Sequence, residues 1–531
     1  MTGTSVSTTE SSRSGATLPD PGPPDVGLHP GLTLGVVCAA VFMLLLDVTI
    51  VSVALADLQR DLGASLADLQ WVVDAYTLTL AGGLLTAATL GDRIGRRRIF
   101  LAGLAVFSAA SLACALAGSA GLLNGARAVQ GVGASLLFGA AMPLIGDAFP
   151  NAARRARAIG VFGACMAAAT AVGPLIGGAL VDGPGWRWIF LMNVPVGVVT
   201  LLGAVRLRES RPADARRADW PGTALLTASL LTLLLALIRG NGDGWASPRI
   251  LGLFLACALL LAGFVYRELR AAEPMLDLGL FGRPAFTGVG LHAFASAATL
   301  VAASYFLAIY LQNILGFTPF QTGLRVLPLS IAAFAAAPLS AALLHRVGVS
   351  TALVVSLLLS GGGLLLAARL DVTSSWTVFV PGFVVAGLGL GMGMAAGASA
   401  ALAVVEPERA GMATGALNTL RQIGTAAGVA VLGALFEHRA TTGVTDLLAA
   451  SGRLAAAPVA VRDRIAGAVG SGIGVRVAEA VPAPVRSAVA AIARQASTDA
   501  LDLVLVASGW AALVAAVGCA VLFRFGRTVR A

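Results

Sequence analysis

The sequence predicts an all-α protein that crosses a membrane many times. Of its 531 residues, 57% are hydrophobic and only 12% are charged, about half the charged fraction of an ordinary soluble domain. The mean hydropathy is +0.86. Fourteen apolar stretches are long enough to cross a bilayer, which takes about 20 residues per helix. These observations exclude a water-soluble globular fold as the expectation.

The predicted spans follow a polar segment, 1–29, that is rich in Ser, Thr, Pro and Gly. This composition is typical of a disordered tail rather than of a signal peptide. The fourteen spans are expected at 32–54, 71–90, 99–117, 122–145, 158–181, 188–205, 220–238, 248–266, 286–310, 323–344, 349–368, 377–401, 411–436 and 501–522.

The arginines orient these spans. If the N-terminus is cytoplasmic, the cytoplasmic segments hold 21 Arg and the short outer loops hold 5. Cytoplasmic loops carry the excess of positive charge, so both termini are predicted to be cytoplasmic. The same distribution explains the basic composition without a nucleic-acid partner. The long loop 437–499 between the last two spans is expected outside, with one or two short amphipathic helices.

An internal repeat divides the chain. At an offset of 255 residues, Gly173 aligns with Gly428 and Gly178 with Gly433, in two stretches that each enter a span from a cytoplasmic loop. Repeated halves with a substrate site between them are typical of transporters. The predicted units are the tail 1–29, a six-helix bundle 30–206, a linker with two inserted spans 207–280, and a second six-helix bundle 281–525.

Local motifs carry a resemblance to a known family. The loop after the second span, Leu90 to Arg98, resembles the loop signature of the major facilitator superfamily, with Ala88 where the first Gly is usual. Arg127 to Gly133 resembles that superfamily's second motif. Gly173 to Gly178 resembles its antiporter motif, with Ala169 in place of the leading Gly. Further matching stretches are Leu46–Val51, Trp186–Phe190, Asn193–Pro195 and Asn418–Gly424. Together with the span count, the sequence resembles the fourteen-helix drug:proton antiporters over about residues 31–525.

This resemblance implies two six-helix bundles plus two inserted helices, and alternating access across the plasma membrane. It implies protons as coupling ion, a lipophilic or amphipathic small molecule as substrate, a monomer, and no cofactor. A symporter importing a nutrient is the alternative. That alternative predicts several polar binding side chains in the spans, whereas the central spans are rich in Ala, Leu and Gly.

Asp47 is the most informative single residue. It lies in the first span among Leu44, Leu45, Leu46 and Ile50, where a carboxylate is costly and usually faces a cavity or a partner. It is predicted to carry protons or to contact a cationic substrate, and a fixed ion pair is the structural alternative. Arg127 lies at a similar depth in the fourth span, and the resemblance ties it to proton exchange.

Four further polar residues in the spans are candidates for the coupling site or the substrate cavity. Gln130 lies on the same helix face as Arg127. Asp74 lies near the outer end of the second span, where it either assists coupling or is wetted by solvent. His292 and Arg421 either line the cavity or are packed and paired within the protein.

The motif at the cytoplasmic end of the second span is a candidate conformational switch. A carboxylate there can dock on the positive end of another helix. The resemblance places that helix in the other half, near Gly411 and Met412. Simple membrane anchoring by the arginines is the alternative. The switch residues are Asp92, Arg93, Gly95, Arg96 and Arg97.

The antiporter motif consists of Gly173, Pro174, Gly177 and Gly178. Glycines let helices approach closely and Pro kinks a span, which suits a gate and a tight seal. Ordinary packing of small residues is the alternative.

Other activities find no support in the residues. All 36 basic residues are Arg, which excludes a lysine-dependent nucleotide site or Schiff base. The five cysteines form no CxxC pair, so no metal or disulfide site is predicted. We also find no Ser/His/Asp arrangement of the kind that would predict an enzyme.

Overall fold

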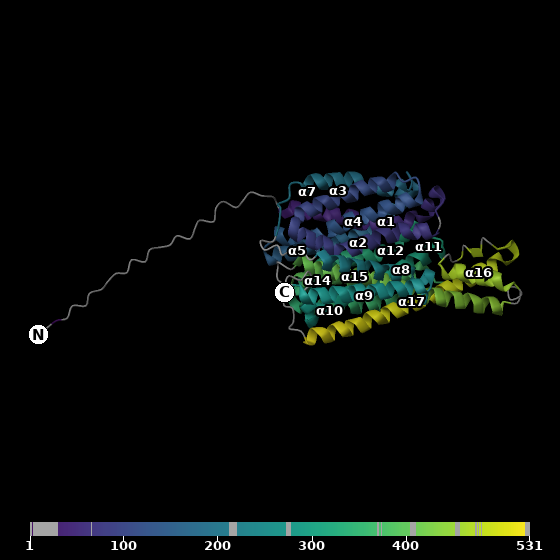
Figure 1. The fold of residues 1–531 in the computed structure, drawn as a ribbon. Helices are drawn as coiled ribbons and strands as arrows, with labels where there is room; N and C mark the ends of the chain where they lie inside the picture. Colours follow the sequence, from purple (N-terminus) through teal and green to yellow (C-terminus); the bar gives the residue numbers. More distant parts are fainter. Residues whose placement is uncertain are drawn as a thin grey trace.

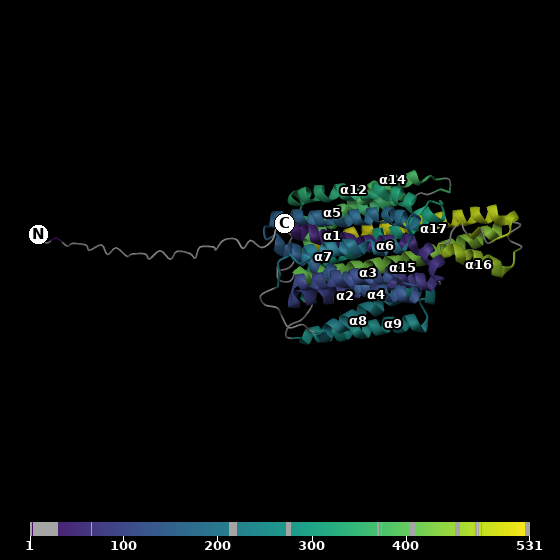
Figure 2. The same cartoon turned by 90° about the horizontal axis from the view of Figure 1, so that it is seen from above.

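A computed structural model of the chain is a bundle of long helices that run side by side (Figures 1 and 2). It describes Gly3 and residues 30–525, apart from 65, 212–219, 272–277, 369–370, 373, 404–409, 452–456, 473–474, 476 and 479–480, and apart from some helix side chains. The predicted tail 1–29 therefore lies outside the described residues, except for Gly3. The α-helices are α1 (Pro30–Leu62), α2 (Leu66–Ile94), α3 (Arg96–Ala115), α4 (Ala120–Ala148), α5 (Ala152–Asp182), α6 (Arg187–Leu191), α7 (Asn193–Ala204), α8 (Trp220–Asp243), α9 (Pro248–Arg270), α10 (Pro284–Ser296), α11 (Ala302–Asn313), α12 (Pro319–Val347), α13 (Val349–Ala367), α14 (Phe379–Ala403), α15 (Ala410–Ala450), α16 (Val459–Gly470) and α17 (Ala483–Phe525).

Each of the fourteen predicted stretches overlaps one of these helices or consecutive ones. The stretch 188–205 is divided between α6 and α7, and 286–310 is interrupted by the π-helical turn η2 (Ala297–Val301). Among the described residues, eleven helices are long and apolar enough to cross a bilayer, or twelve if the bent α2 is one span. The all-α multi-pass fold is thus confirmed, while the number of fourteen spans stays a prediction.

Helix contacts fall into two sets with the same neighbour order. In the first set α2 and α3 pack on α4, α1 packs on α5, and α3 packs on α7. In the second set α12 and α13 pack on α14, α10 packs on α15, and α13 packs on α17. The 255-residue repeat is therefore visible in the packing, because α5 and α15 hold equivalent places. We call these the N set (α1–α7) and the C set (α10–α17).

The two sets meet along two equivalent contacts. Helix α5 packs on α12, and α2 packs on α15. The inserted helices α8 and α9 lie at one edge of the bundle (Figure 2), where α8 contacts both α2 and α15. Leu234 of α8 is buried with Leu78 and Ala81 of α2, next to Ala426 of α15. The inserted pair thus covers one of the two seams between the sets.

The bundle has two distinct ends. At the terminal end, α1 begins at Pro30 and α17 ends at Phe525. At the cap end, α16 projects beyond the rest of the bundle together with the end of α15 and the start of α17 (Figure 1). We define the cap as the described parts of residues 437–499. The expected short surface helices are only partly observed, because α15 continues to Ala450 and α17 already begins at Ala483, with α16 packed against both.

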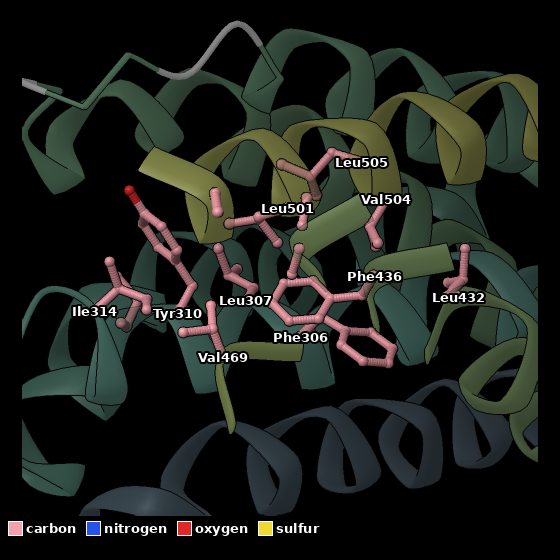
Figure 3. Close-up of a cluster of buried hydrophobic side chains, with 14 of the residues drawn as sticks. Phe306, Leu307, Tyr310, Ile314, Leu432, Phe436, Val469, Leu501, Val504 and Leu505 are labelled. Atoms are coloured by element: carbon pink, nitrogen blue, oxygen red, sulfur yellow. The ribbon is translucent and has the colours of Figure 1, made fainter. Parts of the chain in front are cut away.

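The cap shares a hydrophobic core with the C set. Figure 3 shows Phe306 and Tyr310 of α11 next to Phe436 of α15, Val469 of α16 and Leu501 of α17. Asn313 at the end of α11 donates a hydrogen bond to the Gly472 carbonyl after α16, at 2.7 Å. Among the described residues, the cap is therefore fastened to the C set by both apolar packing and a polar contact.

Candidate functional site: a buried carboxylate network

Asp47 lies in the middle of α1 and is only 1% exposed. Its Oδ2 accepts a hydrogen bond from the guanidinium Nη1 of Arg127, which lies on α4, at 2.5 Å. Arg127 is also 1% exposed. Two opposite charges with full burial form a strong charge-assisted pair, provided that their remaining polar atoms are satisfied.

Amide and hydroxyl side chains form the further hydrogen bonds of this ion pair and of its neighbours. Gln130 donates to Asp47 Oδ1 at 2.9 Å and accepts from Arg127 Nη1 at 2.7 Å. Asn193, at the start of α7, donates to the same Oδ1 at 2.9 Å. Ser111 on α3 accepts a hydrogen bond from Gln130 at 2.8 Å. The members of this network lie on α1, α3, α4 and α7, so the network ties four helices of the N set together.

Two further groups fix the Arg127 side chain. Its Nε donates to the backbone carbonyl of Val72 at 2.9 Å. Its guanidinium carbon lies 4.2 Å from the centre of the Tyr76 ring, within the range of a cation–π contact. The Tyr76 hydroxyl is buried and has no hydrogen-bond partner among the described residues. It is therefore a spare polar group directly beside the ion pair.

The Asp47 carboxylate accepts hydrogen bonds from Arg127, Gln130 and Asn193 together. Both of its oxygens are therefore bound by donors, and Oδ2 faces the Arg127 guanidinium directly. The proton-coupling role predicted for Asp47 and Arg127 stays a prediction.

The sequence indicated only part of this network. Asp47, Arg127 and Gln130 are brought together as predicted at a common depth, but Asn193, Ser111 and Tyr76 were not singled out as site residues. Asn193 did appear in a family motif, just before Pro195. The signal that could have marked it is the break between α6 and α7, which places a polar residue at a helix start inside a span.

At the terminal end, Asp92 is bound within the N set. Arg96 donates from Nε to Asp92 Oδ1 at 2.9 Å and from Nη1 to Asp147 Oδ2 at 2.5 Å. Asp147 also accepts a hydrogen bond from the Ser210 hydroxyl. The predicted docking position near Gly411 and Met412 lies outside the described side chains, so the switch role of Asp92 stays a prediction.

Neighbouring motif residues are fastened to the segment that follows α7. Glu209 accepts the backbone N–H of Arg97 at 3.1 Å and lies 3.6 Å from the Nε of Arg98. Gly95 has φ 121°, and a Cβ there would meet the Glu209 carboxylate at 2.5 Å. Arg93 lies 5.9 Å from the Trp220 ring of α8. The positive φ of residue 95 favours Gly there, because other residues rarely adopt this backbone conformation.

The antiporter-motif glycines lie at two helix contacts. Gly173 and Gly177 face α1: a Cβ on Gly173 would clash with the Thr49 hydroxyl, and one on Gly177 would lie 3.3 Å from the Cα of Ile50. A Cβ on Gly178 would lie 3.0 Å from the backbone nitrogen of Phe320, at the start of α12. The motif therefore packs on α1 and also on the C set. Pro174 lies outside the described side chains.

The remaining candidates form no described hydrogen bond or ion pair with Asp47. His292 is 5% exposed and its Nε2 lies 2.8 Å from the Ser356 hydroxyl of α13, inside the C set. Ser356 donates to the Leu353 carbonyl, so Nε2 is the donor to Ser356. Arg421 lies on α15, with its guanidinium carbon 5.8 Å from the Phe138 ring of α4. The side chain of Asp74 lies outside the described ones.

The cap end holds a cavity of about 360 Å³. Asp57 and Asp61 of α1 line it together with Trp186 and Arg187. Asp61 accepts hydrogen bonds from Trp186 Nε1 at 2.9 Å and from Arg187 at 2.5 Å. These two donors hold the pKa of Asp61 below its usual value.

Comparison with known proteins decides the family. The model described as Major Facilitator Superfamily matches residues 37–429, and matches 289–523 a second time. The chain belongs to the major facilitator superfamily. The resemblance found in the sequence motifs is therefore confirmed. The second match lies within the C set, from α10 to α17.

This major facilitator is similar to several resistance proteins. It is 36% identical to the tetracenomycin C resistance and export protein of Streptomyces glaucescens, over 77% of each chain. It is 38% identical to the multidrug resistance protein Stp of Mycobacterium tuberculosis, over 76% of this chain and 75% of that protein. A solved structure, the human organic anion transporter MFSD10, shares its fold with a TM-score of 0.59 at 14% identity, covering 91% of this chain and all of that one.

Proposed function

We propose that this major facilitator exports lipophilic or amphipathic antibiotics across the plasma membrane in exchange for protons. The names of its relatives support export, because one is a resistance and export protein and the other a multidrug resistance protein, at 36% and 38% identity. Proton coupling is supported by the burial of Asp47, which is 1% exposed and accepts hydrogen bonds from three side chains. A nutrient symporter gains no support from these relatives.

The coupling step that we propose is proton exchange on Asp47. A proton arriving at Oδ2 neutralises the carboxylate and displaces the guanidinium of Arg127. Arg127 keeps its bonds to Val72 and Gln130, so it stays close and favours release of the proton later. In this mechanism Gln130 and Asn193 hold the carboxyl group in place during both states.

A path from Asp47 to the other half follows from the packing. Thr49 is two residues beyond Asp47 and contacts Gly173 of α5, and Gly178 further along α5 contacts Phe320 of the C set. Movement of α1 on protonation therefore acts on the cap-end seal between the sets. Asp92 and Arg96 act at the opposite, terminal end as the second closure.

Export by this route needs no nucleotide. A proton entering the cell gains about 2.3 kcal/mol per 100 mV of membrane potential, before any pH gradient. We propose that the terminal end is cytoplasmic, on the basis of the arginine distribution, and that one chain in the bilayer is sufficient for transport.

The test uses the full chain in proteoliposomes with a panel of lipophilic antibiotics. An imposed pH gradient should drive drug movement against its concentration gradient, and added drug should dissipate the pH gradient. Drug movement that is the same with and without the gradient would overturn proton coupling. Transport of none of the compounds, by a protein that is folded and inserted, would overturn drug export.

A further inference from the structure

Helix α15 carries a row of polar side chains in the middle of a predicted span. Asn418, Gln422 and Thr425 follow one another at helical spacing, and Arg421 lies beside them on the same face. The side chains of Asn418, Arg421 and Gln422 are each partly exposed, although the helix is surrounded by others. We call these four residues the α15 polar row.

The α15 polar row lies where the two helix sets meet. The Arg421 guanidinium carbon is 5.8 Å from the ring of Phe138, which lies on α4 of the N set. Ala426, one residue after Thr425, packs near α2 and α8. The row is therefore oriented toward the N set, on the side where a transported molecule must pass between the sets.

Arg421 has no acidic partner among the residues that the structure describes. Its guanidinium carbon lies 5.8 Å from the centre of the Phe138 ring. Asp47, the buried carboxylate of the N set, is already bound to Arg127, Gln130 and Asn193. A guanidinium at this depth is costly unless an anion or water accompanies it, and such residues usually mark a substrate pathway.

The chemistry of the row fits an acidic aromatic molecule. Arg421 offers a planar set of donors that matches a carboxylate, and the amides of Asn418 and Gln422 add donors on the same face. These two amides make no hydrogen bond with other described residues. The Phe138 ring, 5.8 Å from the Arg421 guanidinium carbon, adds an aromatic group beside these donors.

We propose that the exported compounds include amphipathic aromatic acids, whose anionic group is bound by Arg421 between the helix sets. This proposal rests on the export function proposed above and narrows its substrate class. One consequence is electrical. For the same number of protons, an exported monoanion moves one more charge per cycle than a neutral compound, so its transport depends more steeply on membrane potential.

Binding is tested first, because it does not require proton-driven transport. The probes are 2-naphthoate and its methyl ester, measured by fluorescence titration of the purified full chain. Wild-type protein should bind the acid more tightly than the ester. Arg421→Gln should weaken binding of the acid at least about tenfold and leave the ester within twofold. Arg421→Lys should keep part of the preference. Arg249→Gln, a change in an exposed pair with Asp243, is the matched control.

Three results would overturn the proposal. Wild-type protein could bind the acid no more tightly than the ester, or Arg421→Gln could weaken binding of acid and ester equally. The third is that Arg421→Gln changes the affinity for neither probe. Transport in proteoliposomes then separates this proposal from the general one. If acid and ester are both exported by a proton gradient, but with the same dependence on an imposed potential and on Arg421, the export function stands and the acid site fails. If wild-type protein binds the acid through Arg421 but transports nothing, the export function fails and the site stands.

Discussion

Gly173 of α5 packs directly on Thr49 of α1, so closely that a Cβ at position 173 would clash with the Thr49 hydroxyl. Thr49 lies two residues beyond Asp47, and five residues beyond Gly173 the same α5 meets Phe320 of the C set. One glycine contact thus connects the buried carboxylate with the seam between the two helix sets.

Replacing Gly173 by Ala should separate α1 from α5 and weaken coupling. We expect drug-driven proton movement to fall about tenfold or more, while the protein still inserts in the membrane, because overpacking typically costs about 1–3 kcal/mol. Gly160→Ala is the matched control on the same helix, since a Cβ there meets nothing within 4 Å. Equal activity of the two variants in proteoliposomes would show that the close contact has no role in coupling.

Asp47→Asn should abolish proton-driven transport. The amide cannot exchange a proton, yet it can still accept from Gln130 and Asn193, so the fold should survive. Drug-dependent dissipation of a pH gradient is the measurement. Asp61→Asn serves as control, because Asp61 lies on the same helix but is half-exposed. Proton exchange at the wild-type rate in a well-inserted Asp47→Asn variant contradicts the proton site.

Arg127→Gln should shift the pH dependence of transport upward. The guanidinium stabilises the ionised form of Asp47, so without it the carboxyl group keeps its proton to higher pH. Arg127→Lys keeps the charge and should shift the profile less. Exchange rates are measured from about pH 5 to 9. A profile that Arg127→Gln leaves in place would argue against the pairing as a coupling device.

Asn193→Ala tests a residue that acts through Asp47. Loss of its hydrogen bond to Oδ1 leaves the carboxylate one donor short, so protonation becomes easier and the pH profile should again move upward. A lost bond to a charged group is worth about 1.5–3 kcal/mol. Asn193→Asp would add a second carboxylate and should be more harmful. If Asn193→Ala changes only protein yield and not the pH profile, its role is confined to packing.

Asp92→Asn should slow transport several-fold without stopping it. The change removes one of two acidic partners of Arg96, and Asp147 remains. Moving an equilibrium from 1:99 to 99:1 takes about 5.5 kcal/mol, far more than one partly exposed contact supplies. Cysteine accessibility near Gly411, in a background without native Cys, reports opening at this end. Unchanged labelling there would make Asp92 an anchor rather than a switch.

The sequence predicted the helical fold and the centre of the site for a physical reason. Charged residues in apolar spans are rare and costly, so Asp47 and Arg127 are visible without a structure. Asn193 and Ser111 are not, because their roles depend on which spans pack together. Docking of Asp92 on the other half stays a prediction, and its described side-chain partner is Arg96, four residues along the chain.

The cap was also difficult to predict from composition. Residues 437–499 are rich in Ala, with Arg residues spaced among apolar ones. This composition predicts a loop with short helices rather than a continuation of the spans. In the structure Ala440, Val444 and Leu448 are buried at intervals of four residues, a helical period that continues α15. This spacing of apolar side chains is the signal in the sequence that predicts continuation of the helix beyond residue 436.

The continuity of α15 and α17 from the membrane into the cap has a practical consequence. Because the cap shares its core with the C set, it must turn as one body with those helices, and its tip must travel farther than their centres. A spin label or fluorophore on a cap residue such as Val459, which is 61% exposed, is therefore displaced by a large distance when the C set rotates. It would read out the angle between the two halves during turnover, at a distance from the path that the substrate takes.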